Sequence, residues 1–473
     1  MDTNSSSAAH GGTARLFTLW CLAAALFVAA LNVSSPRTQV NFSDGRFFCL
    51  AAQLFLAGES PYDRERLRAR QREVAQQYPY STAELQGDID RYAYPPASLL
   101  VFAPLGLLDY PSARQLFSLL NVLLMPIAAW VLVLFFDGAN FARHRSLALA
   151  AVIVGLLHSS FPVTLLIGQS DMVVFFALAL TLLALRRRSL LLAAVCGAAA
   201  LIKPQLTLLP ILAVIVRERA WREGLILLGA GVLSNLLALL VIYHPGLPRE
   251  TLDAVIYNRA MAFNHPAAGY GGLFLAARSP VFAAANLLLI PAGVAAVLLA
   301  AWKRDHFPQH TALVAASLLT LYALPLHHYD FVLLLAALLG FVAIDARLAL
   351  PLILLALPIE RESFAQLLLA RVPGALSVTY QIGAALGIDR ESITQSMLAR
   401  NPAWPWLAHQ ILHATYVLLA FVAMQAYVFL RYSQVPPSAA GSPTASPAGV
   451  VRTESPWAAQ RSAKARGSAQ ASE

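Results

Sequence analysis

The sequence has 473 residues, of which 58% are hydrophobic and only 12% are charged, with a formal net charge of +9. A soluble domain usually carries about a quarter of charged residues, so a water-soluble fold cannot bury this much apolar surface. Apolar runs of about 20 residues recur along the chain, as in an all-α polytopic membrane protein. A transmembrane barrel would instead show short segments of alternating polarity.

The basic residues and the cysteines narrow the classes of partner. Basic residues stand mainly in short clusters between apolar runs, which favours a role in membrane topology over binding to nucleic acid. Cys21, Cys49 and Cys196 are scattered and odd in number. They predict neither a disulfide framework nor a zinc site.

The first predicted element is an apolar helix at residues 16–34, after a short cytoplasmic segment at 1–15. Its end is rich in small residues, as in a signal peptide, but the many later spans favour an uncleaved helix. An external loop at 35–94 follows. Within it, residues 45–63 predict an amphipathic helix at the outer interface. The charged stretch RERLRARQRE at 64–73 predicts a solvated helix or loop more than a phosphate-binding patch.

Residues 94–111, YPPASLLVFAPLGLLDYP, either cross the membrane or dip into it from the outer side. A crossing would make the next span, 113–136, run outward and would leave Arg143 and Arg145 outside. A dip keeps these arginines on the cytoplasmic side, where loops are rich in Lys and Arg. We favour the dip, although a helical crossing is the commoner structure for such a segment.

Later basic clusters orient the remaining spans in the same way. They give a bundle of about 12 transmembrane helices within residues 16–432, with a long external loop at 244–280. The Pro/Ser/Ala-rich stretch at 433–473 predicts a disordered cytoplasmic tail. The clusters placed on the cytoplasmic side are RHR at 143–145, RRR at 186–188, RERAWR at 217–222, KR at 303–304 and Arg347.

Several predicted spans hold only 12–16 apolar residues, which is short for a hydrocarbon core of about 30 Å. Such segments are typical of broken helices whose ends line a polar cavity. In the topology above, the polar tips IGQSD (167–171), IKPQ (202–205) and LPLHHYD (324–330) all point to the outer side. Asp44 lies on that side too. The sequence therefore predicts that four polar elements converge on one face.

Two charged residues stand out among them. Asp44, partly shielded near the membrane surface, suits a general base, but Asp is also a common helix cap. Lys203 precedes Pro204, which disfavours helical backbone at Lys203 and places it at a helix break. A lysine at membrane depth is costly and usually functional, and its compact charge suits phosphate. The alternative is a side chain that reaches back to the interface.

The other polar groups have weaker signals. Gln169 and Asp171 suit sugar hydroxyls, although capping of the following helix is an equal alternative. His327 and His328 suit hydrogen bonds to a phosphate or sugar better than a metal site, because adjacent histidines seldom share one metal. His265 lies in a glycine-containing loop that either closes over a substrate or forms an ordinary turn.

The motifs D-G-R-F-F, G-E-S-P-Y-D, Y-A-Y-P-P and A-P-L-G-L-L, followed by G-Q-S-D, L-I-K-P-Q and L-H-H-Y-D, occur in an order that resembles glycosyltransferase family 87. The resemblance implies a GT-C type membrane enzyme, like the polyprenyl-phosphate-mannose-dependent mannosyltransferases. It implies a lipid-phosphate sugar donor, a glycan or glycolipid acceptor, and an active site on the extracytoplasmic side of the inner (plasma) membrane. It also implies Asp44 as the catalytic base and Lys203 as the residue that holds the donor phosphate. The full set of predicted substrate-binding residues is Arg46, Tyr94, Gln169, Asp171, Lys203, His327 and His328.

Three functions remain open at this stage. An inverting glycosyltransferase would need no metal or cofactor, because phosphate departs as an anion that a cation can stabilise. A transporter or lipid-linked sugar flippase would also use broken helices and intramembrane charges. A ligase or polymerase with a lipid-diphosphate donor would share the lipid-facing cavity.

Overall fold

The structure is a computed structural model, and it divides the chain into two units, Met1–Tyr432 and Ser433–Glu473. All regular elements among the described residues are helical, and they belong to the first unit apart from the last residue of the final helix. The predicted helix at 16–34, His265 and the predicted disordered tail beyond residue 434 lie outside the described residues. The structure describes residues 42, 44–78, 85, 92–136, 144–157, 164, 167–260, 272–278, 280–324, 326–356 and 403–434.

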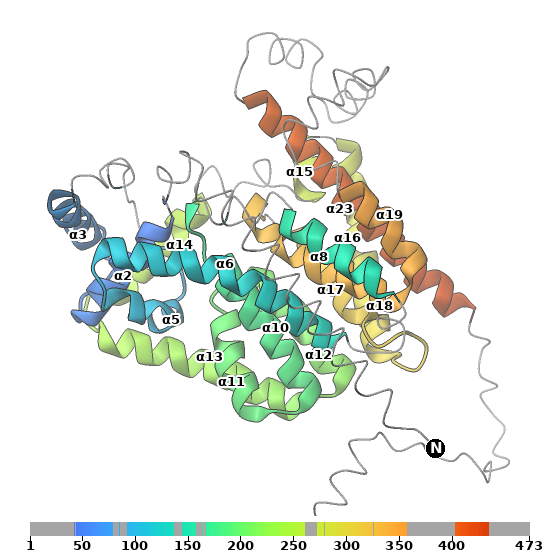
Figure 1. Cartoon of the computed structure of the whole chain (residues 1–473), viewed down its shortest axis with the longest axis horizontal. Helices are drawn as coiled ribbons and strands as arrows, with labels where there is room; N and C mark the ends of the chain where they lie inside the picture. The colour runs from blue at the N-terminus through green and yellow to red at the C-terminus, as the bar shows by residue number, and fades with distance from the viewer. Residues whose placement is uncertain are drawn as a thin grey trace, which may run out of the picture. The chain divides into compact units, whose positions relative to one another are not determined.

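The first described helices pack around α2 (Gly45–Leu56). This helix was predicted to lie at the membrane interface with one face exposed. It forms, but most of its residues are buried. It packs against α5 (Ala97–Gly106) and α6 (Tyr110–Phe135), which lie beside it in Figure 1. Phe48, in the first turn of α2, packs on several aromatic rings from the neighbouring segments, so aromatic packing fixes α2 inside the protein.

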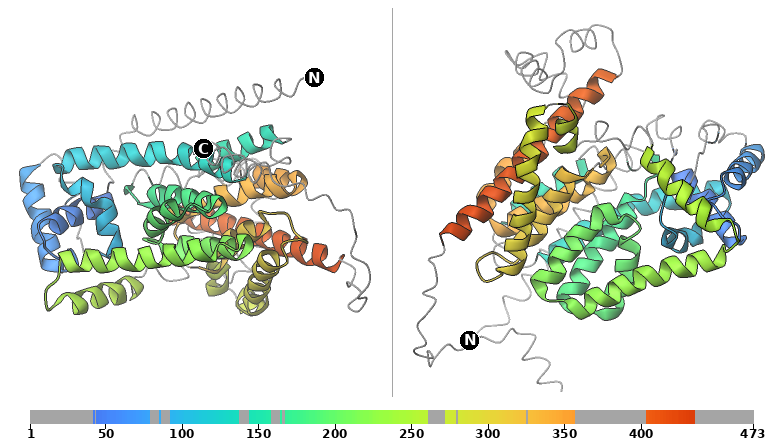
Figure 2. Two further views of the ribbon diagram at one scale, coloured as in Figure 1. Left: turned by 90° about the horizontal axis from the view of Figure 1, so that it is seen from below. Right: turned by 180° about the vertical axis from the view of Figure 1, so that it is seen from behind.

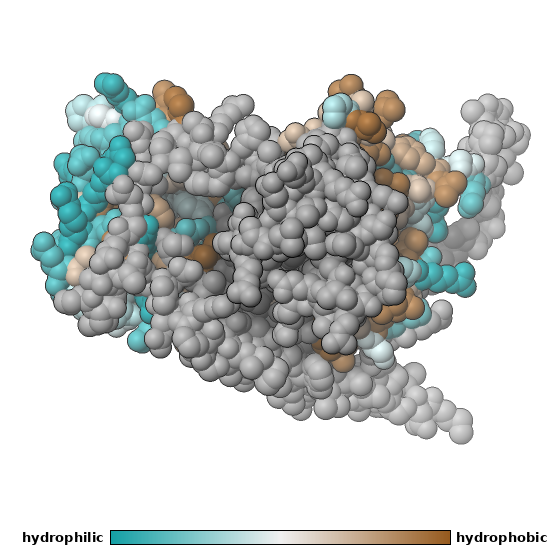
Figure 3. All heavy atoms as spheres, turned by 90° about the horizontal axis from the view of Figure 1, so that it is seen from above, coloured by the Kyte–Doolittle hydropathy of each residue, from teal (hydrophilic) through white to brown (hydrophobic). Residues whose placement is uncertain are grey.

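The charged segment forms α3 (Arg64–Gln77), as predicted for a solvated helix. Its arginines pair with acidic residues on the same helix, for example Arg70 with Glu73 at 2.6 Å, and Asp63 caps its start. Only Leu67, Gln71 and Val74 are buried. Hydrophilic side chains gather at the end of the molecule that carries α3 in Figure 3.

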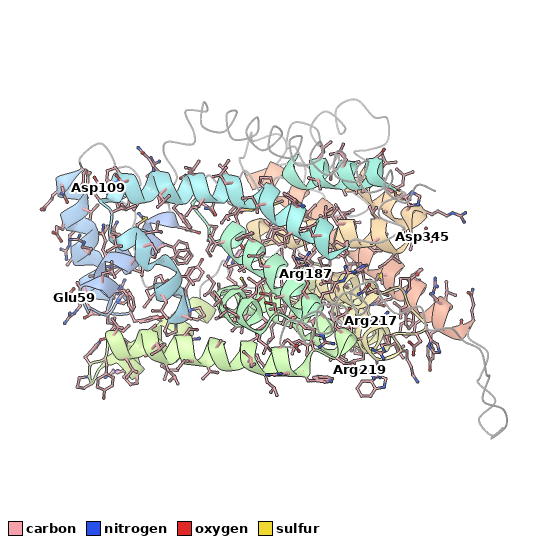
Figure 4. The ribbon with its side chains drawn as sticks, turned by 60° about the horizontal axis from the view of Figure 1, so that its bottom comes forward. Glu59, Asp109, Arg187, Arg217, Arg219 and Asp345 are labelled. Atoms are coloured by element: carbon pink, nitrogen blue, oxygen red, sulfur yellow. The ribbon has the colours of Figure 1, made fainter. Side chains whose placement is uncertain are left out.

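The segment that was predicted to dip into the membrane is short. At about 1.5 Å per residue, the ten residues of α5 span roughly half of a bilayer core. The backbone N–H of Ala97, at the start of α5, donates to Asn235 Oδ1 at 3.0 Å. Glu59 and Asp109 lie at the same end of the molecule (Figure 4). The dip of this segment from the outer side stays a prediction.

The central helices surround α10 (Asp171–Arg187), which packs on α6, α11 (Leu190–Ala200) and α12 (Pro204–Glu218). In turn, α11 packs on the long α13 (Trp221–Val241). Figure 2 shows α6 and α13 running lengthwise on opposite sides of the shorter α10 and α11. These central helices bring the ends of α10 and α12 close together.

The remaining helices complete the first unit. The predicted external loop at 244–280 is not a plain loop, because it contains α14 and α15. Every residue of α18 is buried, which places this helix in the core. The elements are α8 (Arg145–Leu157), α14 (Leu247–Ala260), α15 (Gly272–Arg278), α16 (Pro280–Trp302), α17 (Thr311–Ala323), the 3₁₀ helix η5 (His328–Val332), α18 (Leu333–Ile344), α19 (Ala346–Ala356) and α23 (Ala403–Ser433).

Four helices in the described part are long and apolar enough to cross a membrane: Tyr110–Phe135, Trp221–Val241, Pro280–Trp302 and Ala414–Ser433. Their exposed surface is apolar. For example, Leu225 on α13 is 72% exposed and Leu287 on α16 is 76% exposed. Large exposed leucines on long helices are expected where lipid replaces water. The fold is therefore that of a helical membrane protein, while the count of about 12 spans stays a prediction.

The basic clusters that were predicted to orient the spans also hold the helix ends together. The Arg217 guanidinium donates to the carbonyls of Ala300, Arg304 and Phe307 at 2.7–2.9 Å, at and beyond the end of α16. The Arg186 guanidinium donates to the last carbonyl of α6, that of Phe135. These arginines satisfy carbonyls that have no partner within their own helix.

Candidate active site

Two chain segments cross closely where Asp44 stands. The Asp44 backbone N–H donates to the carbonyl of Ile167 at 2.8 Å. Next to it, Gly168 has a φ of +70°, and a Cβ there would lie 2.5 Å from the Phe42 ring and 2.8 Å from the Gly45 Cα. The glycine is required both for the left-handed backbone and for the close approach. The segments around Asp44 and Gln169 are thereby fixed to each other.

Asp44 precedes α2, but its side chain makes no capping hydrogen bond. Its carboxylate instead accepts a hydrogen bond from Gln169 Nε2. The helix-cap alternative for Asp44 is therefore wrong. The side chain is half-buried, unlike the fully buried Asp171. A carboxylate that is oriented by a donor and still partly exposed has the geometry of a general base.

Gln169 connects Asp44 to the rest of the cluster. Its Oε1 accepts from the Tyr94 hydroxyl at 2.9 Å and from Lys203 Nζ at 3.4 Å. Its backbone carbonyl accepts from Asn121 Nδ2, on α6, at 3.0 Å. Gln169 is thus held at both its side chain and its backbone, and only 3% of it is exposed.

Lys203 stands at a helix break, as predicted, between the end of α11 and Pro204 at the start of α12. Its side chain does not reach back to an interface, because only 4% of the residue is exposed. The ammonium donates to Asp171 Oδ1 at 2.9 Å and Oδ2 at 3.1 Å, and to Asp330 Oδ1 at 3.3 Å. Asp171 therefore pairs with Lys203, and its carboxylate is not the cap of α10.

The HHYD motif contributes Asp330 and the backbone of His327 to the same cluster. The His327 N–H donates to Asp330 Oδ2 at 2.8 Å. Burial lowers the pKa of the His327 imidazole, and the charge of Lys203 lowers it further, while Asp330 and Asp44 oppose the shift. The imidazole is therefore neutral at pH 7. The side chain of His328 lies outside the described part of the chain.

This cluster holds more acidic than basic side chains. Asp44, Asp171 and Asp330 carry three carboxylates around the single ammonium of Lys203. Burying charged groups costs free energy even when they are paired. In a membrane protein such buried ionisable groups usually mark a functional site. The hydrogen-bonded set of Asp44, Gln169, Tyr94, Lys203, Asp171 and Asp330 is called the polar cluster below.

Two arginines flank the turn before α2. Arg46 is buried, with its guanidinium 5.6 Å from the centre of the Phe47 ring. Arg114, on α6, has its guanidinium 5.5 Å from the centre of the Phe42 ring. Sequence reasoning selected Arg46 but missed Arg114 and Asn121. Asn121 had a usable signal, because it interrupts the apolar run LLNVLLM.

Tyr94 meets the cluster through its hydroxyl. Burial raises the pKa of this phenol, although the nearby Lys203 opposes the shift. The phenol therefore keeps its proton and donates it to Gln169. The four polar elements that were predicted to converge do so in the structure.

The fold and the polar cluster define a helical membrane protein with a buried charged site. The model of glycosyltransferase family 87 matches residues 92–326, nearly half of the chain. No curated protein matches the sequence. The chain belongs to glycosyltransferase family 87 and is a membrane glycosyltransferase. The matched segment includes Tyr94, Gln169, Asp171 and Lys203, whereas Asp44 lies ahead of it and joins the cluster through the contacts described above.

Proposed function

We propose that the protein transfers a hexose, mannose in our assignment, from a polyprenyl-phosphate donor to a hydroxyl of a glycan or glycolipid acceptor. The single observation that carries this proposal is the position of Asp44, half-buried and hydrogen-bonded to Gln169 at the edge of the polar cluster. Membership of glycosyltransferase family 87 supports it at the level of sugar transfer.

In this proposal the reaction is a single displacement. Asp44 removes the proton of the acceptor hydroxyl, and the oxygen attacks the anomeric carbon on the face opposite the phosphate. The bond between that carbon and the phosphate oxygen breaks, and its electron pair leaves with the polyprenyl phosphate. The configuration at the anomeric carbon is inverted. No general acid is needed, since the leaving phosphate is stabilised by positive charge.

The binding residues in this proposal surround Asp44. Arg46 is our candidate for direct contact with the donor phosphate, because it follows Asp44 closely in the chain and carries a permanent charge. Tyr94, Gln169 and Asp171 belong to the cluster that shapes the sugar site. His327, as a neutral imidazole, is placed to hydrogen-bond the sugar or phosphate, and His328 is proposed for the same task.

We propose that the site faces the extracytoplasmic side of the inner membrane. The short α5 and the residues Glu59 and Asp109 lie at one end of the helices, and Arg187, Arg217 and Arg219 lie away from that end (Figure 4). Arginine-rich ends face the cytoplasm in most membrane proteins. This arrangement supports a donor in the outer leaflet.

The test is transfer by the purified protein in lipid vesicles, with radiolabelled polyprenyl-phosphate mannose and polyprenyl-diphosphate sugar supplied side by side. The proposal predicts a glycosylated product from the monophosphate donor. Movement of the labelled lipid between leaflets without product would indicate a transporter or flippase. Product from the diphosphate donor alone would indicate a ligase or polymerase.

A further inference from the structure

We propose that Lys203 is a positioning residue, which acts through Gln169 to orient the Asp44 carboxylate and does not contact the donor phosphate directly. This inference rests on the proposed role of Asp44 as the base. It also changes the expectation drawn from the family resemblance, which implied that Lys203 holds the phosphate.

The first step is the donor capacity of Lys203. An ammonium has three protons, and oxygen atoms of three residues lie within hydrogen-bonding distance of Nζ, those of Asp171, Asp330 and Gln169. Only 5% of the side chain is exposed. A phosphate could reach this ammonium only by displacing a buried carboxylate, which would be left as an uncompensated charge.

The second step is the orientation of the Gln169 amide. Its oxygen faces two donors, the Tyr94 hydroxyl and the Lys203 ammonium. Its nitrogen faces an acceptor, the Asp44 carboxylate. Turning the amide over would set donors against donors and oxygen against oxygen. Lys203 and Tyr94 together therefore fix which end of the amide meets Asp44.

The third step is the effect on Asp44. The positive charge of Lys203 polarises the amide, and this strengthens the hydrogen bond that the amide nitrogen donates to the carboxylate. Asp171 and Asp330 hold the ammonium at the far side of Gln169. A positioned donor keeps the carboxylate ionised and aimed in one direction, as outer residues do around other reactive groups.

The experiment compares three proteins with the wild type. Gln169→Leu removes the connecting amide. The pair Lys203→Met with Asp171→Asn removes the ammonium without changing the net charge. The pair Arg188→Met with Glu223→Gln is the matched control, because it removes an ion pair of 3.2 Å at the end of α10, whereas Asp171 of the polar cluster stands at the start of that helix.

The first readout needs no substrate. The infrared difference spectrum between each protein and its own Asp44→Asn derivative isolates the carboxylate band of Asp44 and its titration. We expect the midpoint to move to higher pH in Gln169→Leu and in the Lys203 pair, because a lost donor disfavours the charged form, and to stay in place in the control. Among the described residues, the charged or titratable groups around Asp44 are Arg46, Tyr94, Arg114, Asp171, Lys203, His327 and Asp330.

The second readout is steady-state transfer. We expect kcat to fall about 100-fold in both test proteins, with the donor KM changed by less than about twofold. Because the two changes break one connection, their effects should not add when combined. A raised donor KM with an unmoved infrared midpoint in the Lys203 pair would overturn the inference and return Lys203 to the phosphate.

The two readouts separate this inference from the proposed function. If the wild type transfers no sugar but the Asp44 band shifts as expected in the test variants, the proposed function is refuted. The connection between Lys203 and Asp44 then still holds. If the Lys203 pair does not fold, Tyr94→Phe replaces it, because this change removes one of the two donors to Gln169 Oε1. A midpoint that stays at the wild-type pH in both Gln169→Leu and Tyr94→Phe overturns the inference.

Discussion

Gln169 donates a hydrogen bond to Asp44 across 125 positions of sequence, at a point where two backbone segments touch. The contact joins a residue before α2 to one before α10. The crossing at Gly45 and Gly168 is what brings the two side chains together.

Gly168→Ala should destabilise the protein and abolish transfer. A non-glycine residue at φ +70° costs about 1–2 kcal/mol. The overlap of the new methyl group with Phe42 and Gly45 adds about 1–3 kcal/mol. Thermal unfolding in detergent measures the loss of stability. A transfer assay on the folded fraction measures the loss of activity.

Two other glycines separate these causes. Gly58 has a φ of +72°, and a Cβ there would meet only the Val241 carbonyl oxygen, at an ordinary contact distance of 4.0 Å, so Gly58→Ala should show the backbone cost alone. Gly229 lies in α13 with nothing within 4 Å of a Cβ, so Gly229→Ala should raise stability by about 0.5–1 kcal/mol. Equal losses in Gly168→Ala and Gly58→Ala would show that the crossing is not tight.

Arg217→Met should destabilise the protein by about 3 kcal/mol, because three carbonyls lose a charged donor. Arg187→Met is the matched control, since Arg187 is exposed and, like Arg217, lies away from the end that carries Glu59 and Asp109 (Figure 4). Both changes remove one positive charge. Equal stability of the two variants in thermal unfolding would mean that the arginines act only through topology.

Arg219→Gly should raise the stability by about 1 kcal/mol. Arg219 ends α12 with a φ of 52°, a left-handed conformation that glycine adopts at little cost. Arg188 ends α10 in the same way, but its guanidinium donates to the Arg219 carbonyl and pairs with Glu223, so Arg188→Gly should gain nothing. Chemical denaturation of the two variants checks the contrast. A loss of stability in Arg219→Gly would contradict this explanation.

Labelling with a membrane-impermeant thiol reagent tests the orientation of the protein in the membrane. Leu107 follows α5, two residues before Asp109, and is 77% exposed. Arg187 lies away from the end that carries Asp109 (Figure 4). With the native cysteines replaced, a cysteine at Leu107 should react from the extracytoplasmic side, whereas one at Arg187 should be protected until the membrane is opened. The opposite pattern would reverse the proposed orientation.

The sequence was informative where a local rule applied. Pro204 placed Lys203 at a helix break, and the polar tips between apolar runs predicted the convergence that the structure shows. These features depend on a few neighbouring residues, which one sequence contains in full.

Other features depend on contacts between distant segments and have no local signal. Nothing beside Lys203 in the chain shows that Asp171 and Asp330 hold its ammonium, because these partners come from α10 and η5. The amphipathic pattern of α2 predicted a surface helix, since aromatic packing partners such as Phe102 and Phe117 are unknown before folding. The basic clusters likewise gave no sign that Arg217 would cap α16.

The most direct test of the account is the comparison of purified wild type and Asp44→Asn, with radiolabelled polyprenyl-phosphate mannose, measuring both sugar transfer and donor binding. Asparagine keeps the shape of the side chain but cannot accept the acceptor proton. We predict that transfer falls by about 10²–10⁴-fold, while the donor Kd stays at the wild-type value. Full turnover by Asp44→Asn would remove the base from the site and contradict the proposed mechanism.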